Sequence, residues 1–247
     1  LLNFPSTHPP GMATTTRRSD RQNDAHLPDL QQGITLLDAD SAVRTAIHAL
    51  AVDHVLLSGG DAVWIDTGTH ARTEPLTELA PSPRVLDRIR VARGFTPFQH
   101  LDLLRSLPGL LTDDTNLVVV PELDRYYRDD SLFADEGRDM LLSGIASLAT
   151  AARNHGVAVL VTRASSDAFS EPIETAADQP LTCERTPFGP RFRTPDDETL
   201  VYPVDGGRWV QTTLSFWADI LSAREPLYEH PLGETNANPG VSVRGSN

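Results

Sequence analysis

The residues best suited to metal binding or nucleophilic catalysis occur at spacings that fit neither kind of site. The chain has eight histidines, but His48 and His54 are not spaced to share one face of a helix, as the histidines of a helical zinc site do. Cys183 is the only cysteine, so neither an intrachain disulfide nor a cysteine metal cluster can form. The sequence therefore predicts no metal site, and the histidines are expected at the surface or half-buried. Three serines lie in no nucleophile-elbow pattern, so a hydrolase is not indicated: Ser41, Ser58 and Ser143.

Strands alternate with helices along the middle of the chain. Strands buried on both faces appear as continuous apolar runs, whereas helices show apolar residues at helical spacing. The alternation predicts an α/β fold with a mainly parallel sheet and helices on both faces. Strands are expected over 33–37, 62–66, 88–92, 116–120 and 157–161. Helices are expected after Ser41, which can cap the first one, then over 74–80, 83–87, from Thr96, over 135–155 and over 214–223.

Short segments after residue 182 predict antiparallel hairpins at the edge of the sheet. Turn residues separate the segments 191–193, 199–202 and 208–213. The aromatic residues of this region alternate along the expected strands, which places them in the core rather than on a base-stacking surface. They are Phe188, Phe192, Tyr202, Trp209, Phe216 and Trp217.

The two ends of the chain differ from its middle. Residues 1–30 show no apolar period and are expected to form a disordered leader, 31–224 a single core domain, and 225–247 a flexible tail. Met12 is a candidate start residue, and the segment before it lacks the pattern of a signal peptide. No apolar run approaches the ~20 residues that span a bilayer. A cytoplasmic protein without a membrane partner is therefore expected.

The charged residues are strongly biased. There are 34 acidic against 21 basic residues, giving a net charge of −13, and every basic residue is arginine, since lysine is absent. Carboxylates hold water and repel neighbouring molecules, while molar salt screens the destabilisation that they cause. The bias indicates a protein from an extreme halophile. A GC-rich genome is the alternative, which explains the missing lysine but not the acidic excess.

Three segments resemble the core strands of RecA/RadA-type recombination ATPases. They are 63–69 (VWIDTGT), 88–95 (RIRVARGF) and 156–163 (GVAVLVTR). The segment 91–100 is also similar to the A-R-x-F-x-x-x-Q/H segment of archaeal RadA-like recombinases. The resemblance covers residues 31–223 and implies a RecA-like P-loop fold from a halophilic archaeon.

The resemblance also implies where ATP would bind, and the first of these places lacks the family's residues. The family's glycine-rich phosphate loop corresponds to 38–45, which contains no glycine and carries Asp38 and Asp40. Successive glycine N–H groups normally surround the phosphates, and carboxylates there repel them. Arg44 and Thr45 match the position of the family's Lys-Thr pair.

Three further elements of the family's ATP chemistry are also missing. Asp66 is followed by Thr-Gly without the catalytic glutamate, and Pro121 stands where the magnesium-binding acidic residue ends its strand. Glu122 and Asp124 are the substitutes nearest to it, although Asp124 is expected to cap a helix. The segment 162–165 contains no switch glutamine. Four losses predict a protein that does not hydrolyse ATP, with no cofactor; a degenerate nucleotide site would use Arg44, Thr45, Asp66, Glu122 and Asp124.

The sequence gives only weak support for binding to DNA. The second DNA loop of RadA-like proteins corresponds to 164–184, which holds five acidic residues and no basic residue before its end. Phosphate binding needs clustered cations, and high salt weakens it. Arg17, Arg18 and Arg21 form the one concentrated basic patch, which is more typical of a solvated end. Tyr126 and Tyr127 are expected to be exposed and to suit a protein partner.

The sequence therefore favours a RecA-like pseudo-ATPase that acts by binding a protein partner. The partner is expected to be a RecA-family protein or a second copy, in DNA recombination or repair. Two alternatives remain open at this point. One is a divergent, DNA-stimulated ATPase of the RadA/RadB type, which would use ATP and magnesium; the other is a KaiC-like signalling or sequestering module.

Overall fold

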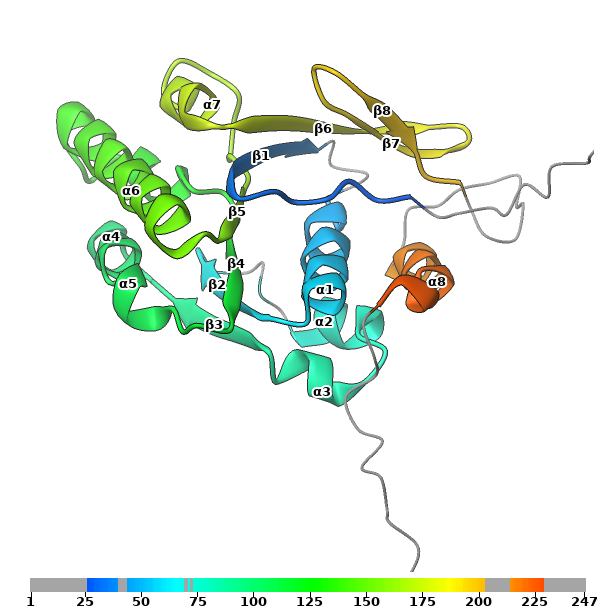
Figure 1. Cartoon of the computed structure of the whole chain (residues 1–247). Helices are drawn as coiled ribbons and strands as arrows, with labels where there is room; N and C mark the ends of the chain where they lie inside the picture. Colours follow the sequence, from blue (N-terminus) through cyan, green and yellow to red (C-terminus); the bar gives the residue numbers. More distant parts are fainter. Residues whose placement is uncertain (1–25, 40–43, 69–70, 72, 203–213, 229–247) are drawn as a thin grey trace, which may run out of the picture.

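The computed structural model describes residues 26–39, 44–68, 71, 73–202 and 214–228, and within them eight strands form one sheet (Figure 1). The strand order is β3-β2-β4-β5-β1-β6-β7-β8. The first six strands of the chain run parallel, while β7 and β8 are antiparallel additions at one edge. The α/β fold with a mainly parallel sheet is confirmed. The strands are β1 Gly33–Ala39, β2 Asp61–Asp66, β3 Ile89–Arg93, β4 Thr115–Val120, β5 Ala158–Val161, β6 Gln179–Thr186, β7 Gly189–Arg193 and β8 Glu198–Leu200.

Helices cover both faces of the sheet, as the order of elements predicts. The apolar core on one face includes buried residues of α1, α2, α3 and α8, and the core on the other face includes those of α4, α5, α6 and α7. Figure 1 shows α4, α5 and α6 on one side of the sheet and α1, α2 and α8 on the opposite side. The helices are α1 Ala46–Ser58, α2 Thr73–Leu79, α3 Pro83–Leu86, α4 Pro97–Arg105, α5 Leu107–Leu110, α6 Ala134–His155, α7 Glu171–Ala176 and α8 Leu214–Ala223, with 3-10 turns η2 Arg125–Arg128 and η3 Glu225–Leu227.

Two helices begin or end where their local sequence requires it. The Thr96 hydroxyl accepts a hydrogen bond from the Gln99 N–H at 3.2 Å, which satisfies one of the free N–H groups at the start of α4. α6 ends at Gly156, whose φ of 68° is the left-handed conformation that glycine adopts without a steric penalty. Local capping chemistry therefore sets these boundaries, and both agree with the sequence prediction.

α1 differs from its prediction at its start and in its burial. The helix begins at Ala46, and Ser41, the expected cap, lies outside the described residues. All residues from Ala46 to Asp53 are buried, whereas a single apolar face was expected. The reason is that α2 and α8 cover the side of α1 that faces away from the sheet.

The segment 164–184 is not the loop that the sequence predicts. It contains α7 and most of β6, and β6 pairs in parallel with β1. Buried residues alternate with less buried ones in the middle of β6, at Leu181 and Cys183. The strand therefore lacks the continuous apolar run that identifies its neighbours in the sequence.

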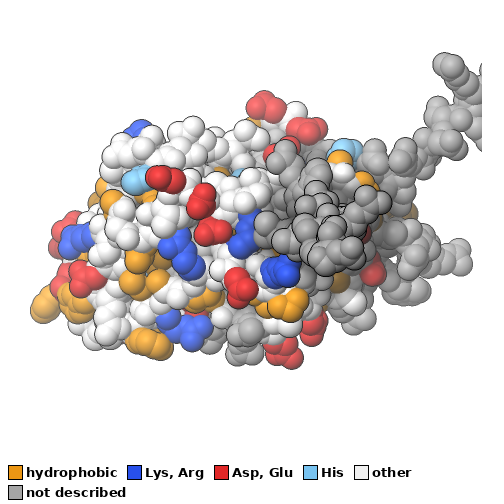
Figure 2. Space-filling view, turned by 60° about the horizontal axis from the view of Figure 1, so that its bottom comes forward, with side chains coloured by type: hydrophobic (Ala, Val, Ile, Leu, Met, Phe, Trp, Pro, Cys, Tyr) orange, Lys and Arg blue, Asp and Glu red, His pale blue; other side chains and the backbone are white. Residues whose placement is uncertain are grey.

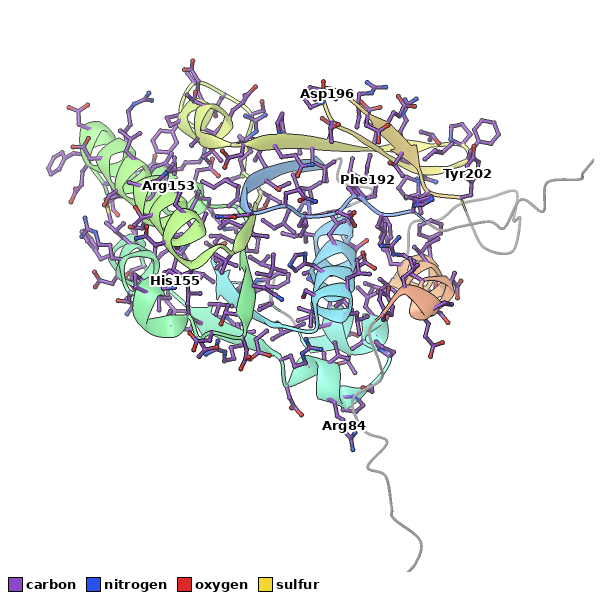
Figure 3. All side chains as sticks on the ribbon, viewed as in Figure 1. Arg84, Arg153, His155, Phe192, Asp196 and Tyr202 are labelled. Atoms are coloured by element: carbon purple, nitrogen blue, oxygen red, sulfur yellow. The ribbon has the colours of Figure 1, made fainter. Side chains whose placement is uncertain are left out.

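The aromatic residues near the C-terminal hairpin divide between core and surface. Phe192, Phe216 and Trp217 are buried, as expected, and the Phe192 and Trp217 ring centroids lie 6.1 Å apart. Phe188 and Tyr202 are exposed, which contradicts the prediction. Figure 3 shows Phe192 inside the fold and Tyr202 at its margin. Trp209 lies outside the described residues.

The packed part of the chain extends beyond the predicted core at both ends. Leu27 and Leu30, assigned by the sequence to the leader, are buried against the core. Tyr228, assigned to the tail, donates a hydrogen bond to the Asp53 carboxylate at 2.8 Å. Across the described ranges, no helix combines the length and the apolar character needed to cross a membrane.

Candidate functional site

A cavity of about 370 Å³ lies at the carboxyl ends of β1, β4 and β5, beside β6. β1 and β5 are neighbours in the sheet, but the chain leaves β1 toward α1 on one face and leaves β5 toward α7 on the other. Ligands of open α/β sheets usually bind at such a switch point. The lining residues are Leu37, Asp38, Ala39, Arg44, Ile47, Pro121, Glu122, Thr162, Arg163, Ala164, Ser165, Ser166, Thr182 and Glu184.

The cavity brings together three segments that the sequence links to ATP chemistry. Asp38 and Arg44 come from the segment that replaces the phosphate loop, and Glu122 from the end of β4. The segment 162–165 continues from β5 along the same cavity. Of the five predicted nucleotide-binding residues, Arg44 and Glu122 therefore share one site.

The other three predicted residues are engaged elsewhere. The Thr45 hydroxyl accepts a hydrogen bond from the Trp217 indole N–H at 2.9 Å. Asp66 is fully buried at the end of β2, where one carboxylate oxygen lies 2.9 Å from the Arg93 Nε and the other accepts from the Ala71 N–H at 3.1 Å. Both side chains thus hold parts of the fold together.

Asp124 is also buried, and it stands at the N-cap position of η2, but its side chain does not cap the helix as the sequence predicts. It makes no capping hydrogen bond to η2. Instead, one oxygen accepts from the Ala164 N–H at 2.7 Å, and the other lies 2.6 Å from the Arg128 Nε. A buried carboxylate needs such partners, and here they connect η2 to the chain that follows β5.

The charges around the cavity are mostly paired within the protein. Arg163 makes a two-pronged contact with Asp38, at 2.9 Å from Nε and 2.5 Å from Nη2, and a third contact with Glu174 at 3.0 Å. Burial disfavours its charged form, but the hydrogen bonds to Asp38 and Glu174 raise the pKa of Arg163. Glu122 is paired with Arg125. Glu184 is paired with Arg191 at 3.1 Å.

These residues do not fit a magnesium–triphosphate group. The described lining contains three carboxylates, Asp38, Glu122 and Glu184, against the guanidinium groups of Arg44 and Arg163. Carboxylates repel a polyanion at short range, and Arg163 already has its own carboxylate partners. Among the described residues, no group of three or more His, Cys, Asp or Glu side chains is arranged to hold a metal ion.

The chain matches no protein-family model. No curated protein matches it either. The resemblance to RecA-type ATPases therefore rests on the sequence motifs, and the cavity that several of those segments line is the feature from which a function can be inferred.

Glu122 has a strained backbone at the mouth of this cavity. Its φ is 45°, and among the described residues it is the one residue other than glycine that has a positive φ. Its N–H donates to the Thr162 hydroxyl at 2.8 Å, which fixes the backbone across from β5. Strained backbone often marks a functional position.

We expect Glu122→Gly to be more stable than Glu122→Ala by about 1 kcal/mol, because the left-handed conformation is costly for a residue with a Cβ. Both variants lack the side chain that pairs with Arg125, so their difference isolates the backbone. Urea denaturation of the two variants at one salt concentration measures it. An alanine variant as stable as the glycine variant would show that residue 122 is not strained.

The two adjacent tyrosines do not form the exposed patch that the sequence predicts. Tyr127 is buried, and its hydroxyl lies 2.8 Å from the His100 Nδ1. Tyr126 is half-buried and donates to the Gly94 carbonyl at 2.8 Å. η2 packs against α4 and α6, so both side chains contact the fold. His48 and His100 are buried too, contrary to prediction.

Proposed function

We propose that this chain is a RecA-like protein that does not hydrolyse ATP and acts by binding a protein partner in DNA recombination or repair. The motifs in 63–69, 88–95 and 156–163 support the RecA-like assignment. The sheet supports it as well, since parallel strands with helices on both faces and an antiparallel edge are what the resemblance implies.

The observation that carries the proposal is the charge of the cavity. Segments corresponding to the family's phosphate loop, magnesium-binding strand end and switch residue meet there. They supply Asp38 in the segment of the phosphate loop, Glu122 at the strand end and, in the switch segment, Arg163, which is bound to carboxylates of its own chain; Arg44 stands where the family has its lysine. Such a site disfavours the polyanion that hydrolysis requires.

A surface at the β3 edge supports a protein partner. β3 is the last strand of the sheet, so one side of it has no neighbouring strand within the described residues. Three exposed apolar side chains lie on β3 and just beyond it: Val91, Phe95 and Phe98, the two phenylalanines being 69% and 57% exposed. Open edges and exposed aromatic side chains are common in protein interfaces.

The chain after β5 favours a protein over DNA as the partner. Arg128 binds both oxygens of Asp167 at 2.8 Å and lies over the Phe169 ring, 4.8 Å from its centroid. The hydrogen bond from Arg128 holds the pKa of Asp167 well below its usual range. Figure 2 shows acidic and basic side chains interleaved on the face that it displays, without a continuous basic area. Phosphate contacts need clustered cations.

Titration with magnesium and ATP tests the proposal directly. In molar potassium chloride, which suits an acidic chain, we expect no binding heat and no phosphate release, with or without single-stranded DNA. A matched Arg44→Ala variant should behave in the same way. ATP binding by the wild type, with turnover that the Arg44 variant loses, would establish the divergent ATPase instead. A pull-down at the same salt concentration would identify the partner.

A further inference from the structure

Asp38 and Arg163 both line the cavity and form an ion pair there. In this pair the Asp38 carboxylate binds Arg163 as an anion from solution would. The Arg163 side chain is only 8% exposed, while the Asp38 side chain is 39% exposed. The two prongs, at 2.9 and 2.5 Å, are the contacts that an arginine also makes with a phosphate group. The anion that Arg163 holds is therefore supplied by the chain itself, from the end of β1.

A second cation lines the same cavity. Arg44 is exposed, and no carboxylate of the described chain is paired with it. Hydroxyl groups complete the polar lining, from Thr162, Ser165, Ser166 and Thr182. Two guanidinium groups and several hydroxyls form a suitable set of donors for a phosphate group. The carboxylate of Asp38 already occupies Arg163, the less exposed of the two arginines.

We propose that Asp38 is a built-in anion that keeps a phosphate-binding site closed. The inference rests on the proposed function, because it names the carboxylate of the cavity that directly occupies Arg163. In the wild type, Asp38 out-competes phosphate for Arg163, since an intramolecular partner needs no association from solution. Neutralising Asp38 opens the site to a phosphate group, free or at the end of a polyphosphate.

The Asp38→Asn variant tests this inference. We expect it to bind inorganic phosphate and pyrophosphate about tenfold or more tightly than the wild type, because charged hydrogen bonds to Arg163 become available. Calorimetric titration measures the affinity, and parallel titrations with phosphate, pyrophosphate and ATP distinguish a free phosphate group from a nucleotide. Circular dichroism shows whether the variant is folded.

Two matched variants separate the role of Asp38 from a general loss of negative charge. Glu174→Gln removes the other, more exposed partner of Arg163 but leaves Asp38 in place, so it should gain no phosphate affinity. The double variant Asp38→Asn with Arg163→Gln should lose the gain of the single variant. Equal gains in the Glu174 and Asp38 variants, or a gain that persists without Arg163, would overturn the proposal.

A measurement on the wild type covers the case in which Asp38→Asn does not fold. An arginine-directed dicarbonyl reagent, read out by mass spectrometry, should modify Arg44 readily and Arg163 slowly. Equal modification of the two would show that Asp38 does not hold Arg163. The two proposals also fail separately: ATP binding by the wild type overturns the proposed function, whereas a folded Asp38→Asn variant without phosphate affinity overturns only this inference.

Discussion

Replacing Arg224 with alanine is expected to lower the free energy of unfolding by about 3–5 kcal/mol, because it leaves a buried carboxylate without its countercharge. The carboxylate is that of Asp53 on α1. Its oxygens lie 2.7 Å from the Arg224 Nε and 3.0 Å from Nη2, and both side chains are buried. Tyr228 donates a further hydrogen bond to it, and its own pKa is raised by burial and by the Asp53 charge.

An exposed ion pair of the same chain is the control. Arg193 contacts Glu198 at 3.3 Å with both side chains about half exposed, so Arg193→Ala should cost only about 0–1 kcal/mol. Urea denaturation compares both variants with the wild type. Replacing Asp53 and Arg224 together with leucine should recover much of the loss, since no unpaired charge is then buried. A loss of similar size in the Arg193 and Arg224 variants would contradict the burial of the Asp53 pair.

Lowering the pH from 6.5 to about 4 should destabilise the fold by roughly 3 kcal/mol through His100 alone. Burial lowers the pKa of this imidazole from 6.5 to about 4, although the Asp66 charge opposes the shift. Between these pH values the unfolded chain binds a proton that the folded chain does not, so stability falls as the pH falls. Well above pH 6.5 His100 is neutral in both states and contributes no pH dependence.

The His100→Gln variant isolates this contribution. Glutamine is neutral at every pH and can still form a hydrogen bond with the Tyr127 hydroxyl, the partner of His100 at 2.8 Å. His54, whose pKa burial also lowers, is present in both proteins and cancels in the difference. Urea denaturation at several pH values should show the wild type losing stability relative to the variant as the pH falls below 6.5. If the free energy of unfolding changed with pH in the same way in the two proteins, His100 would not have a lowered pKa in the folded state.

Local sequence patterns predicted most of the fold, because they record which strands are buried on both faces and where helices begin. β4 and β5 are buried on both faces and appear as continuous apolar runs. The start of α4 follows from Thr96 and Pro97. β6 was missed because its burial depends on β1 and on the core that it shares with α1 and α8, which are distant in the sequence. The leader and tail residues that pack on the core, Leu27 and Tyr228, carry no periodic signal of their own.

Two of the five site residues expected from the sequence line one cavity, but the contacts within that cavity could not be predicted. The motifs indicated which segments to compare, and Arg44 and Glu122 do line one cavity. Asp38 and Arg163 are 125 positions apart, and nothing in either segment specifies that they pair. The contacts of Asp66 with Arg93 and of Asp124 with Ala164 likewise join segments that lie apart in the sequence. Only the three-dimensional packing of the chain determines which of these side chains and backbone groups meet.

The position of α8 over α1 has a consequence for how the protein is made. Trp217 and Thr45 are joined by a hydrogen bond across 172 positions, so the part of α1 that α8 covers stays exposed until nearly the whole core has left the ribosome. A nascent chain of this kind exposes part of an apolar helix for most of its synthesis, and such segments are what chaperones bind. Ribosome stalling before α8 would therefore leave an aggregation-prone intermediate.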